Sequence, residues 1–261
     1  SFSQEKPANC EKKKLSKEEK KRKRLKNIDF IDKNFFIRPA YSIQSNQLII
    51  NDRDNLGKTI EYRPNVLGSV GGQVKIKGIV ASYMHRLPPG PTAISRFGET
   101  DYMNIDVNIQ SRIVGLDFDY IDYKGFYLSN PQVFIPDFNN SSDTFPHRPD
   151  LRYFSVGFKA TFVFTKSFSI NSAFAQTERM KKSAGSFMMT IGDRYSKISF
   201  DSSIVPVSEY KYHKKFFEPD FDNIKFNSTF MAFGFGYSFV KKNFNFTPIF
   251  LLGSGIQIQK Y

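Results

Sequence analysis

Large apolar side chains alternate with small or polar ones along most of the chain. In "TFMAFGFGYSFV", residues 229–240, Met231, Phe233 and Phe235 alternate with alanine and glycine. A period of two is the period of a β-strand, so such a strand has one apolar face and one nearly bare face. Similar patterns predict further strands, among them those at 35–43, 71–76, 79–85, 101–109, 116–120, 152–164, 167–177, 187–191 and 244–259.

The connections between the predicted strands alternate in length. Short turns are expected at 77–78, 110–112, 165–166 and 241–242, and long polar loops at 88–100, 128–150 and 208–224. Short turns at one end and long loops at the other are typical of transmembrane β-barrels. The apolar stretches are also about 9–11 residues long, which is what a tilted strand needs to cross a bilayer.

The polar faces distinguish a membrane barrel from a soluble sandwich. A soluble sandwich hides its large side chains and exposes abundant lysine and glutamate. Here the polar faces carry mostly Gly, Ser, Ala, Asn and Gln, with a few charges that are predicted to pair across a lumen: Lys75, Asp106, Asp117, Asp119 and Lys159. Because backbone polar groups in lipid need internal partners, the sheet is expected to close. We predict an all-β, antiparallel, up-and-down transmembrane β-barrel of about 12 strands, in a range of about 10–14.

The strand count is uneven. Eleven strands are recognisable, whereas bacterial single-chain barrels use even numbers. Either "NQLIIND" or "KTIEYRP" is therefore expected to be a further strand, or strands follow the end of this sequence. Tyr261 is a typical aromatic last residue, but Gln257 and Gln259 share its face. The barrel, residues 34–261, is thus predicted to be incomplete at its carboxyl end.

Residues 1–33 differ from the rest in charge. The formal net charge is +13, of which the segment from Lys12 to Lys26 contributes +8. This basic arm includes Lys12, Lys13, Lys14, Lys20, Lys21, Arg22, Lys23 and Arg24. It is either a flexible or short-helical solvated segment or a device that docks on an acidic partner or on anionic headgroups. The charge does not imply nucleic-acid binding.

The first residues, "SFSQEK", resemble the end of a signal peptide, where small residues flank the cleavage point. We therefore expect export, with the protein in a bacterial outer membrane and the arm in the periplasm. The one cysteine, Cys10, allows no internal disulfide and no zinc cluster. The chain contains 29 Phe, 13 Tyr and no Trp, but no apolar run of ~18 residues that would predict a transmembrane helix.

Candidate catalytic residues are sparse. The histidines are His85, His147 and His213, far apart in sequence, and neither Ser186 nor Ser254 lies in a G-x-S-x-G motif. A Ser–His pair requires the fold to bring two of these together. The histidines and the cysteine also lack the spacing of metal ligands. We predict no enzymatic activity, no metal and no cofactor; an outer-membrane hydrolase is the least favoured alternative.

Three stretches carry a family resemblance: "YRPN" (62–65), "YKGFYL" (123–128) and "AFAQTERMKKSAGSF" (173–187). In this order, with strands between them, they resemble an uncharacterised family of Bacteroidota outer-membrane β-barrels that is known only as a domain of unknown function. The resemblance covers residues 34–259. It implies a barrel in the outer membrane and no particular activity.

The charged and polar residues of these stretches have two interpretations each. In the first stretch, Tyr62, Arg63, Pro64 and Asn65 either fix a loop or contact a partner. In the third, Glu178, Arg179, Lys181 and Lys182 mark a hairpin tip, which is either solvated or in contact with lipopolysaccharide phosphates. Gly125 is expected where a neighbouring group comes close to the strand.

Two functions remain open after these considerations. The first is a structural or accessory subunit of an envelope machine for outer-membrane protein assembly, type 9 secretion or nutrient uptake. Its partners would be outer-membrane lipid, lipopolysaccharide and other envelope proteins. The second is a small pore or transporter, although about twelve strands leave little free lumen once side chains fill it.

Overall fold

The fold is known from a computed structural model of the chain. The structure describes residues 28–30, 35–43, 47–51, 59–76, 79–111, 113–133, 135–172, 178–201, 223–241 and 244–260. The predicted signal-peptide remnant, Cys10, the basic arm and His213 lie outside these residues.

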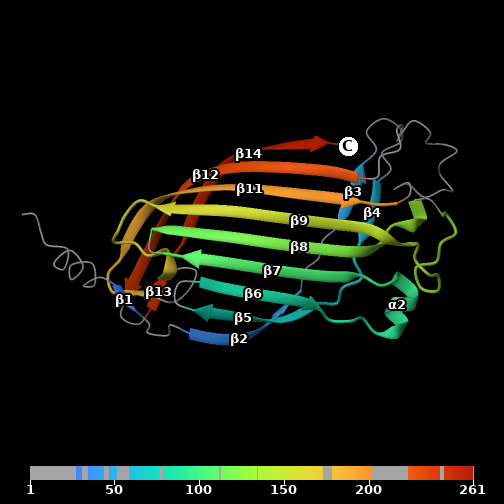
Figure 1. The fold of residues 1–261 in the computed structure, drawn as a ribbon, viewed down its shortest axis with the longest axis horizontal. Coiled ribbons are helices and arrows are strands. Elements are labelled where there is room, and N and C mark those ends of the chain that lie inside the picture. The colour runs from blue at the N-terminus through green and yellow to red at the C-terminus, as the bar shows by residue number, and fades with distance from the viewer. Residues whose placement is uncertain are drawn as a thin grey trace, which may run out of the picture.

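Twelve strands form one antiparallel sheet (Figure 1). Most of it is a meander in which neighbours in sequence are neighbours in space. Its members are β2 (Phe35–Ser42), β5 (Ser69–Ile76), β6 (Ile79–Arg86), β7 (Asp101–Gln110), β8 (Val114–Leu128), β9 (His147–Val163), β11 (Ala184–Ser199), β12 (Asn223–Lys241), β13 (Phe244–Phe246) and β14 (Ile249–Lys260). The predicted all-β antiparallel class and the approximate strand number are confirmed.

The remaining strands attach to this meander at its two ends. Both segments considered for an additional strand are strands, β3 (Leu48–Asn51) and β4 (Thr59–Arg63), which pair with each other. β4 also pairs with the last residues of β8. At the other end of the sheet, β1 (Ile28–Phe30) and β10 (Glu178–Met180) form a separate two-stranded sheet.

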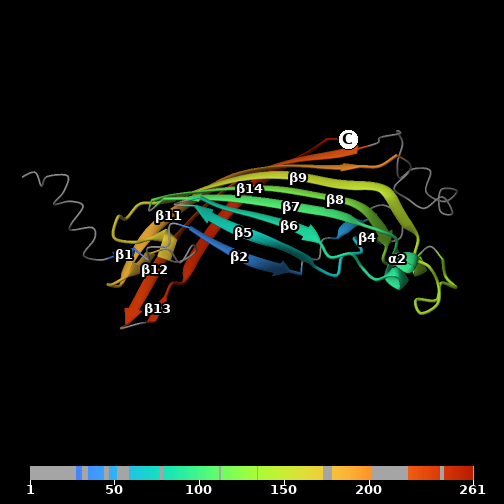
Figure 2. The same ribbon diagram turned by 60° about the horizontal axis from the view of Figure 1, so that its bottom comes forward.

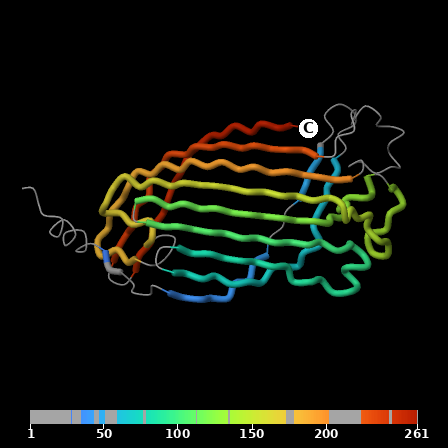
Figure 3. The backbone as a smooth tube through the Cα atoms, viewed as in Figure 1, coloured from blue at the N-terminus to red at the C-terminus, as the bar shows by residue number. Residues whose placement is uncertain are grey.

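The two ends of the sheet differ in their connections (Figure 3). The turns of two or three residues after β5, β7 and β12 lie at one end, which we call the turn end. The connection from β9 to β11, where a short turn at 165–166 was predicted, also lies at this end but is longer and contains β10. The connections of 87–100 and 129–146 lie at the other, the loop end. The first contains a short helix, α2 (Pro91–Phe97), and the second a 3-10 turn, η1 (Pro131–Val133). Pro91 fits the first helical turn, and Gly98, with φ 74°, ends the helix.

Two predicted strands differ in the structure. The segment 167–177 is not a strand where it is described, because Phe168, Ser169 and Ile170 are all buried and their backbone turns. The alternation of apolar and polar residues in this segment arises because both sides of the segment are packed beneath the sheet. The last strand is divided into β13 and β14 at Pro248, which lacks the N–H that a sheet ladder uses.

The described sheet is an open, curved layer rather than a closed barrel (Figure 2). Its edges are β2 and β14, and no pairing joins them among the described strands. Nine long strands alternate in direction from one edge to the other, so β14 runs parallel to β2. The two edges therefore cannot pair in the antiparallel sense used elsewhere in the sheet. The predicted closure is not seen in this part of the chain.

Buried apolar residues form two clusters on the inner, concave face. The first is at the loop end, where Tyr62, Tyr102, Tyr123 and their neighbours pack between β4 and the meander. The second is at the turn end and includes Phe168, Met180 and Met188. The inner face between the clusters is polar.

Candidate functional site

Apart from the two apolar clusters, the inner face buries small polar side chains while the outer face exposes large apolar ones. On β11, Ser186, Thr190 and Ser196 are buried on the inner face, whereas Phe187 on the outer face is 69% exposed. The outer face of β12 and β14 continues this exposed apolar surface through Met231, Phe233, Phe235, Phe239, Phe250, Leu252, Ile256 and Ile258. We call this the apolar outer surface. A large contiguous apolar surface of this kind marks contact with lipid or with another protein.

The centre of the inner face holds an ion pair that spans three strands. Asp119 of β8 and Arg194 of β11 lie in one row with Gly157 of β9 between them. The Arg194 Nη2 donates to Asp119 Oδ1 at 2.8 Å. A side chain at Gly157 would occupy the path of this pair, because a Cβ there would lie 2.4 Å from Asp119 Oδ1. The glycine therefore allows the two charges to meet above the intervening strand.

Hydroxyl groups extend this ion pair into a network. Arg194 Nη1 donates to Ser155 Oγ at 2.9 Å, and Ser155 and Ser196 share a hydrogen bond of 3.0 Å. Tyr153 continues the network at 3.3 Å from Ser196. These contacts hold the Arg194 guanidinium in a fixed position on the inner face.

A second pair borders a cavity nearer the turn end. Lys159 Nζ lies 3.1 Å from Asp117 Oδ2, directly across β8 and β9. The two residues line a cavity of about 300 Å³. Arg38, which donates to Gln73 at 2.7 Å, lines the same cavity from β2 and β5. The cavity therefore presents charges of both signs to its contents.

The other two residues that were predicted to face the lumen, Lys75 and Asp106, also lie on the inner face of the sheet. Asp106 accepts a hydrogen bond from Ser82 at 3.3 Å. Lys75 is buried beside the Phe36 ring and interacts electrostatically with Glu178. The structure thus places all five on one face but in separate groups. Arg194 and Arg38 were missed as lumen charges, although each lies in phase with the polar positions of its strand.

Two of the three family stretches meet at the loop end. The Asn65 amide nitrogen Nδ2 donates to the carbonyl oxygens of Gly98 at 2.7 Å and Ala93 at 3.2 Å. Thr100 accepts from the Asn65 backbone N–H and donates to the Gly125 carbonyl, at 2.8 and 2.7 Å. These bonds tie the α2 loop to β4 and β8.

Position 125 requires glycine because of its backbone conformation and its close main-chain neighbour. Its φ of 90° lies in the left-handed region, and a Cβ there would lie 2.2 Å from the Glu99 carbonyl oxygen. The expected close approach is therefore one of main chain to main chain. It coincides with an irregularity in the β8–β9 register between Lys124 and Phe126.

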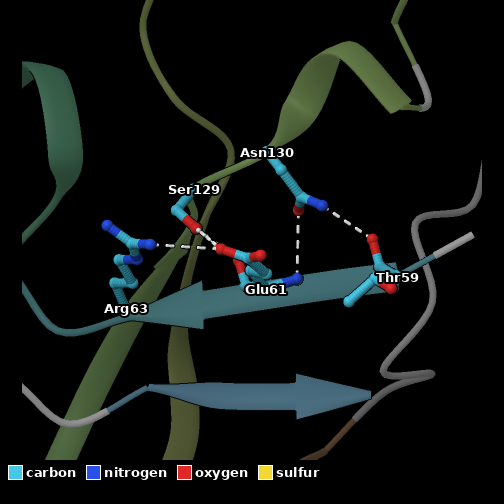
Figure 4. Close-up of polar contacts among 5 residues, drawn as sticks. All are labelled: Thr59, Glu61, Arg63, Ser129 and Asn130. Carbon is cyan, nitrogen blue, oxygen red and sulfur yellow. Dashed lines mark hydrogen bonds and ion pairs between the residues drawn. The ribbon is translucent and has the colours of Figure 1, made fainter. Parts of the chain in front are cut away.

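β4 is held against the start of the 129–146 connection by polar contacts (Figure 4). Ser129 donates to the Glu61 carbonyl oxygen, and Asn130 bonds the backbone of Glu61 and of Thr59, at 3.0 and 2.6 Å. Arg63 pairs with the Glu61 carboxylate at 3.2 Å. Tyr62, on the opposite side of β4, is buried in the apolar cluster of the loop end.

Charged pairs also lie on β9 at the loop end. Arg148 donates two hydrogen bonds to Asp150, at 2.7 and 2.8 Å, and Arg152 donates two to Asp122, at 2.6 and 2.8 Å. The Arg148 bonds lower the pKa of the Asp150 carboxyl well below its usual range, and the Asp201 N–H contributes in the same direction. Asp150 is therefore ionised throughout the physiological pH range.

The third family stretch lies at the turn end. Glu178 is buried and accepts a hydrogen bond from Ser169, while Arg179, Lys181 and Lys182 are exposed. Through β10 this stretch pairs with β1. It is thus at the opposite end of the sheet from the first two stretches.

The candidate nucleophiles and bases are not brought together in the described part of the chain. Ser186 is buried, donates to the Phe187 carbonyl oxygen at 2.7 Å and accepts from the Thr165 N–H at 2.8 Å. His85 and His147 are exposed, and no hydrogen bond joins either of them to Ser186 or Ser254 among the described residues. No group of three potential metal ligands occurs within the same residues.

Sequence comparison places the chain in a protein family. The model of a domain of unknown function, DUF4421, matches residues 28–261. The chain belongs to this family. No curated protein and no solved structure matches the DUF4421 chain. No helix in the described part of this DUF4421 domain is long and apolar enough to cross a membrane.

Proposed function

We propose that the protein is a non-enzymatic integral β-barrel of a bacterial outer membrane, of the Bacteroidota type, that serves as a structural or accessory subunit of an envelope machine. One observation carries the proposal: small hydroxyl side chains are buried inside the sheet while Phe187, Phe233 and Phe250 are exposed outside it. In water such an arrangement would be unfavourable, because about 25 cal/mol is lost for each Å² of apolar surface left exposed. In a bilayer the same apolar surface contacts lipid tails and does not carry this free-energy cost.

The two apolar clusters favour an accessory role over a pore. One cluster covers the inner face at each end, so a path along the inner face would meet apolar side chains twice. The central charges Asp119 and Arg194 pair with each other rather than facing free water. We therefore expect no steady conductance in planar bilayers. A stable conductance whose ion selectivity changes in Asp117→Asn would support the pore instead.

The loop end would face the outside and the turn end the periplasm. Short periplasmic turns and long outer loops are the rule in outer-membrane barrels. In this orientation β1 and the third family stretch lie on the periplasmic side, where the basic arm would begin. Lys181 and Lys182 would then be remote from lipopolysaccharide. The arm and the exposed residues of this stretch would meet periplasmic partners.

The test is co-purification from native outer membrane in mild detergent, with partners quantified by mass spectrometry. We expect stoichiometric partners from an assembly, secretion or uptake complex. Deletion of residues 4–26, which leaves β1 in place, should reduce their recovery. A chain in which the same residues are shuffled, with the charge unchanged, is the control for electrostatic docking. Purification as a lone barrel would contradict the accessory role.

A further inference from the structure

Three lysines lie in one row at the loop end of the outer face. Lys197 of β11 is the direct cross-strand partner of Lys225 of β12, which is in turn the partner of Lys260 of β14. All three are in phase with the apolar outer surface of their strands. Tyr195 and Ile258, two residues away on β11 and β14, are 38% and 57% exposed. The row therefore points outward.

The row concentrates positive charge. Side chains directly opposite each other on antiparallel strands have Cβ atoms about 4.5–5.5 Å apart, and like charges there are destabilising. Among the described residues none of the three amines has an ion-pair partner. The nearby outer-face carboxylates are engaged elsewhere, since Asp193 accepts from Thr229 at 2.5 Å and Asp122 binds Arg152. An anion placed on the row would relieve the repulsion.

The surface beside the row determines what kind of anion fits. Ile256 and Ile258 lead along β14 to Lys260 and are among the most exposed apolar side chains, at 73% and 57%. A ligand that contacts both features has acyl chains against the isoleucines and a phosphate at the lysines. A soluble anion would use only the second feature.

We propose that Lys197, Lys225 and Lys260 form a binding site for the phosphate-bearing headgroup of an anionic membrane lipid. The proposal rests on the proposed function, because it needs the apolar outer surface to lie in a bilayer. The row lies near the loop-end termini of β11 and β12, so in the proposed orientation it meets the outer leaflet. Each basic residue near an anionic surface strengthens binding to it.

The test uses the folded protein in zwitterionic detergent, titrated with bisphosphorylated lipid A and followed by native mass spectrometry. The triple variant Lys197→Gln, Lys225→Gln, Lys260→Gln should bind about a hundredfold more weakly, since each lysine near an anionic surface strengthens binding about fivefold. The control replaces two exposed lysines of the turn end, Lys166 and Lys241, with glutamine. This control should bind as the parent protein does.

Further variants and ligands distinguish the possible outcomes. The triple lysine-to-arginine variant should restore binding, and dephosphorylated lipid A should bind all variants weakly. Inorganic phosphate that competes at equal concentration would overturn the lipid assignment, as would an equal loss of binding per lysine in the test and control glutamine variants. Insertion into vesicles of zwitterionic lipid is measured on the same samples. Normal insertion with lysine-independent lipid A binding refutes this site alone, whereas failure to insert refutes the proposed function.

Discussion

The substitution Gly157→Ala tests whether the ion pair across β9 stabilises the sheet. In an ordinary strand position this change stabilises by about 0.5–1 kcal/mol, because glycine loses more conformational freedom on folding. Here the new Cβ would lie 2.4 Å from Asp119 Oδ1 and 2.8 Å from Arg194 Nη2. Both groups are side-chain ends, so they would move apart rather than strain the backbone.

The cost follows from the contacts that this movement breaks. The pair is partly exposed, at 24% for Asp119 and 39% for Arg194, so its loss costs about 1 kcal/mol. Loss of the hydrogen bond from Arg194 to Ser155 adds about 1–1.5 kcal/mol. After the glycine gain is subtracted, we expect a net destabilisation of about 1–2 kcal/mol.

Urea titration of the refolded protein in detergent measures this free energy of unfolding. The chain has no Trp and 13 Tyr, so tyrosine fluorescence is the probe. Gly115→Ala is the control, because Gly115 lies on the same inner face and its Cβ would meet only Ile170, at 3.9 Å. It should be neutral or stabilising. If Gly157→Ala costs as much in an Asp119→Ala background as in the parent protein, the ion pair is not the cause and the reasoning is refuted.

Three further substitutions address the loop end. Because the pKa of Asp150 is lowered in the folded state, its contribution is present above the unfolded pKa and is lost as the pH falls toward the folded value. Asp150→Asn should therefore cost about 1–2 kcal/mol at pH 7 and flatten the loss of stability between pH 5 and pH 2 in urea titrations; an unchanged profile would contradict the Arg148 pairing. Asn65→Ala should speed amide hydrogen exchange in residues 92–98 at least tenfold, since about 1.5 kcal/mol of hydrogen bonding is removed, and unaltered exchange would show that other contacts hold the loop. Gly125→Ala should cost about 3 kcal/mol or more, because it combines a left-handed φ with a main-chain clash; a change below 1 kcal/mol in the urea midpoint analysis would exclude this conformation.

The strand period made most of the meander predictable. Along the central parts of β7 and β9 one parity is apolar and the other is small or polar, whereas at the loop end Tyr102 and Leu151 lie on the otherwise polar parity and are buried in the apolar cluster. The strand period gave a wrong prediction at Phe168–Ile170. This segment is buried on both sides, and its serine is hydrogen-bonded, so large apolar and small polar residues alternate there without forming a strand. At Pro248 the alternation of apolar and polar residues continues although the hydrogen-bond ladder is interrupted. The break between β13 and β14 is therefore not visible in the hydrophobic pattern.

The candidate site was predictable in its composition but not in its pairing. The inner charges Asp117 and Lys159 were found by parity, and their pairing required the β8–β9 register. Arg194 required a longer reading of its strand, and Gly157 has no sequence signal because its role depends on two residues of other strands. The lysine row is similar: residues 197, 225 and 260 are unrelated in sequence until the registers are known.

The pairings of β4 and β1 have a consequence for the order of assembly. Each meander strand pairs with the strand that precedes it, so the sheet can grow as successive hairpins. β4 instead pairs with the end of β8, and β1 pairs with β10, which follows six strands of the meander. The segments that are synthesised first therefore reach their places late, after the strands that receive them. A chaperone or insertion factor that binds these early segments would have a window in which they are accessible.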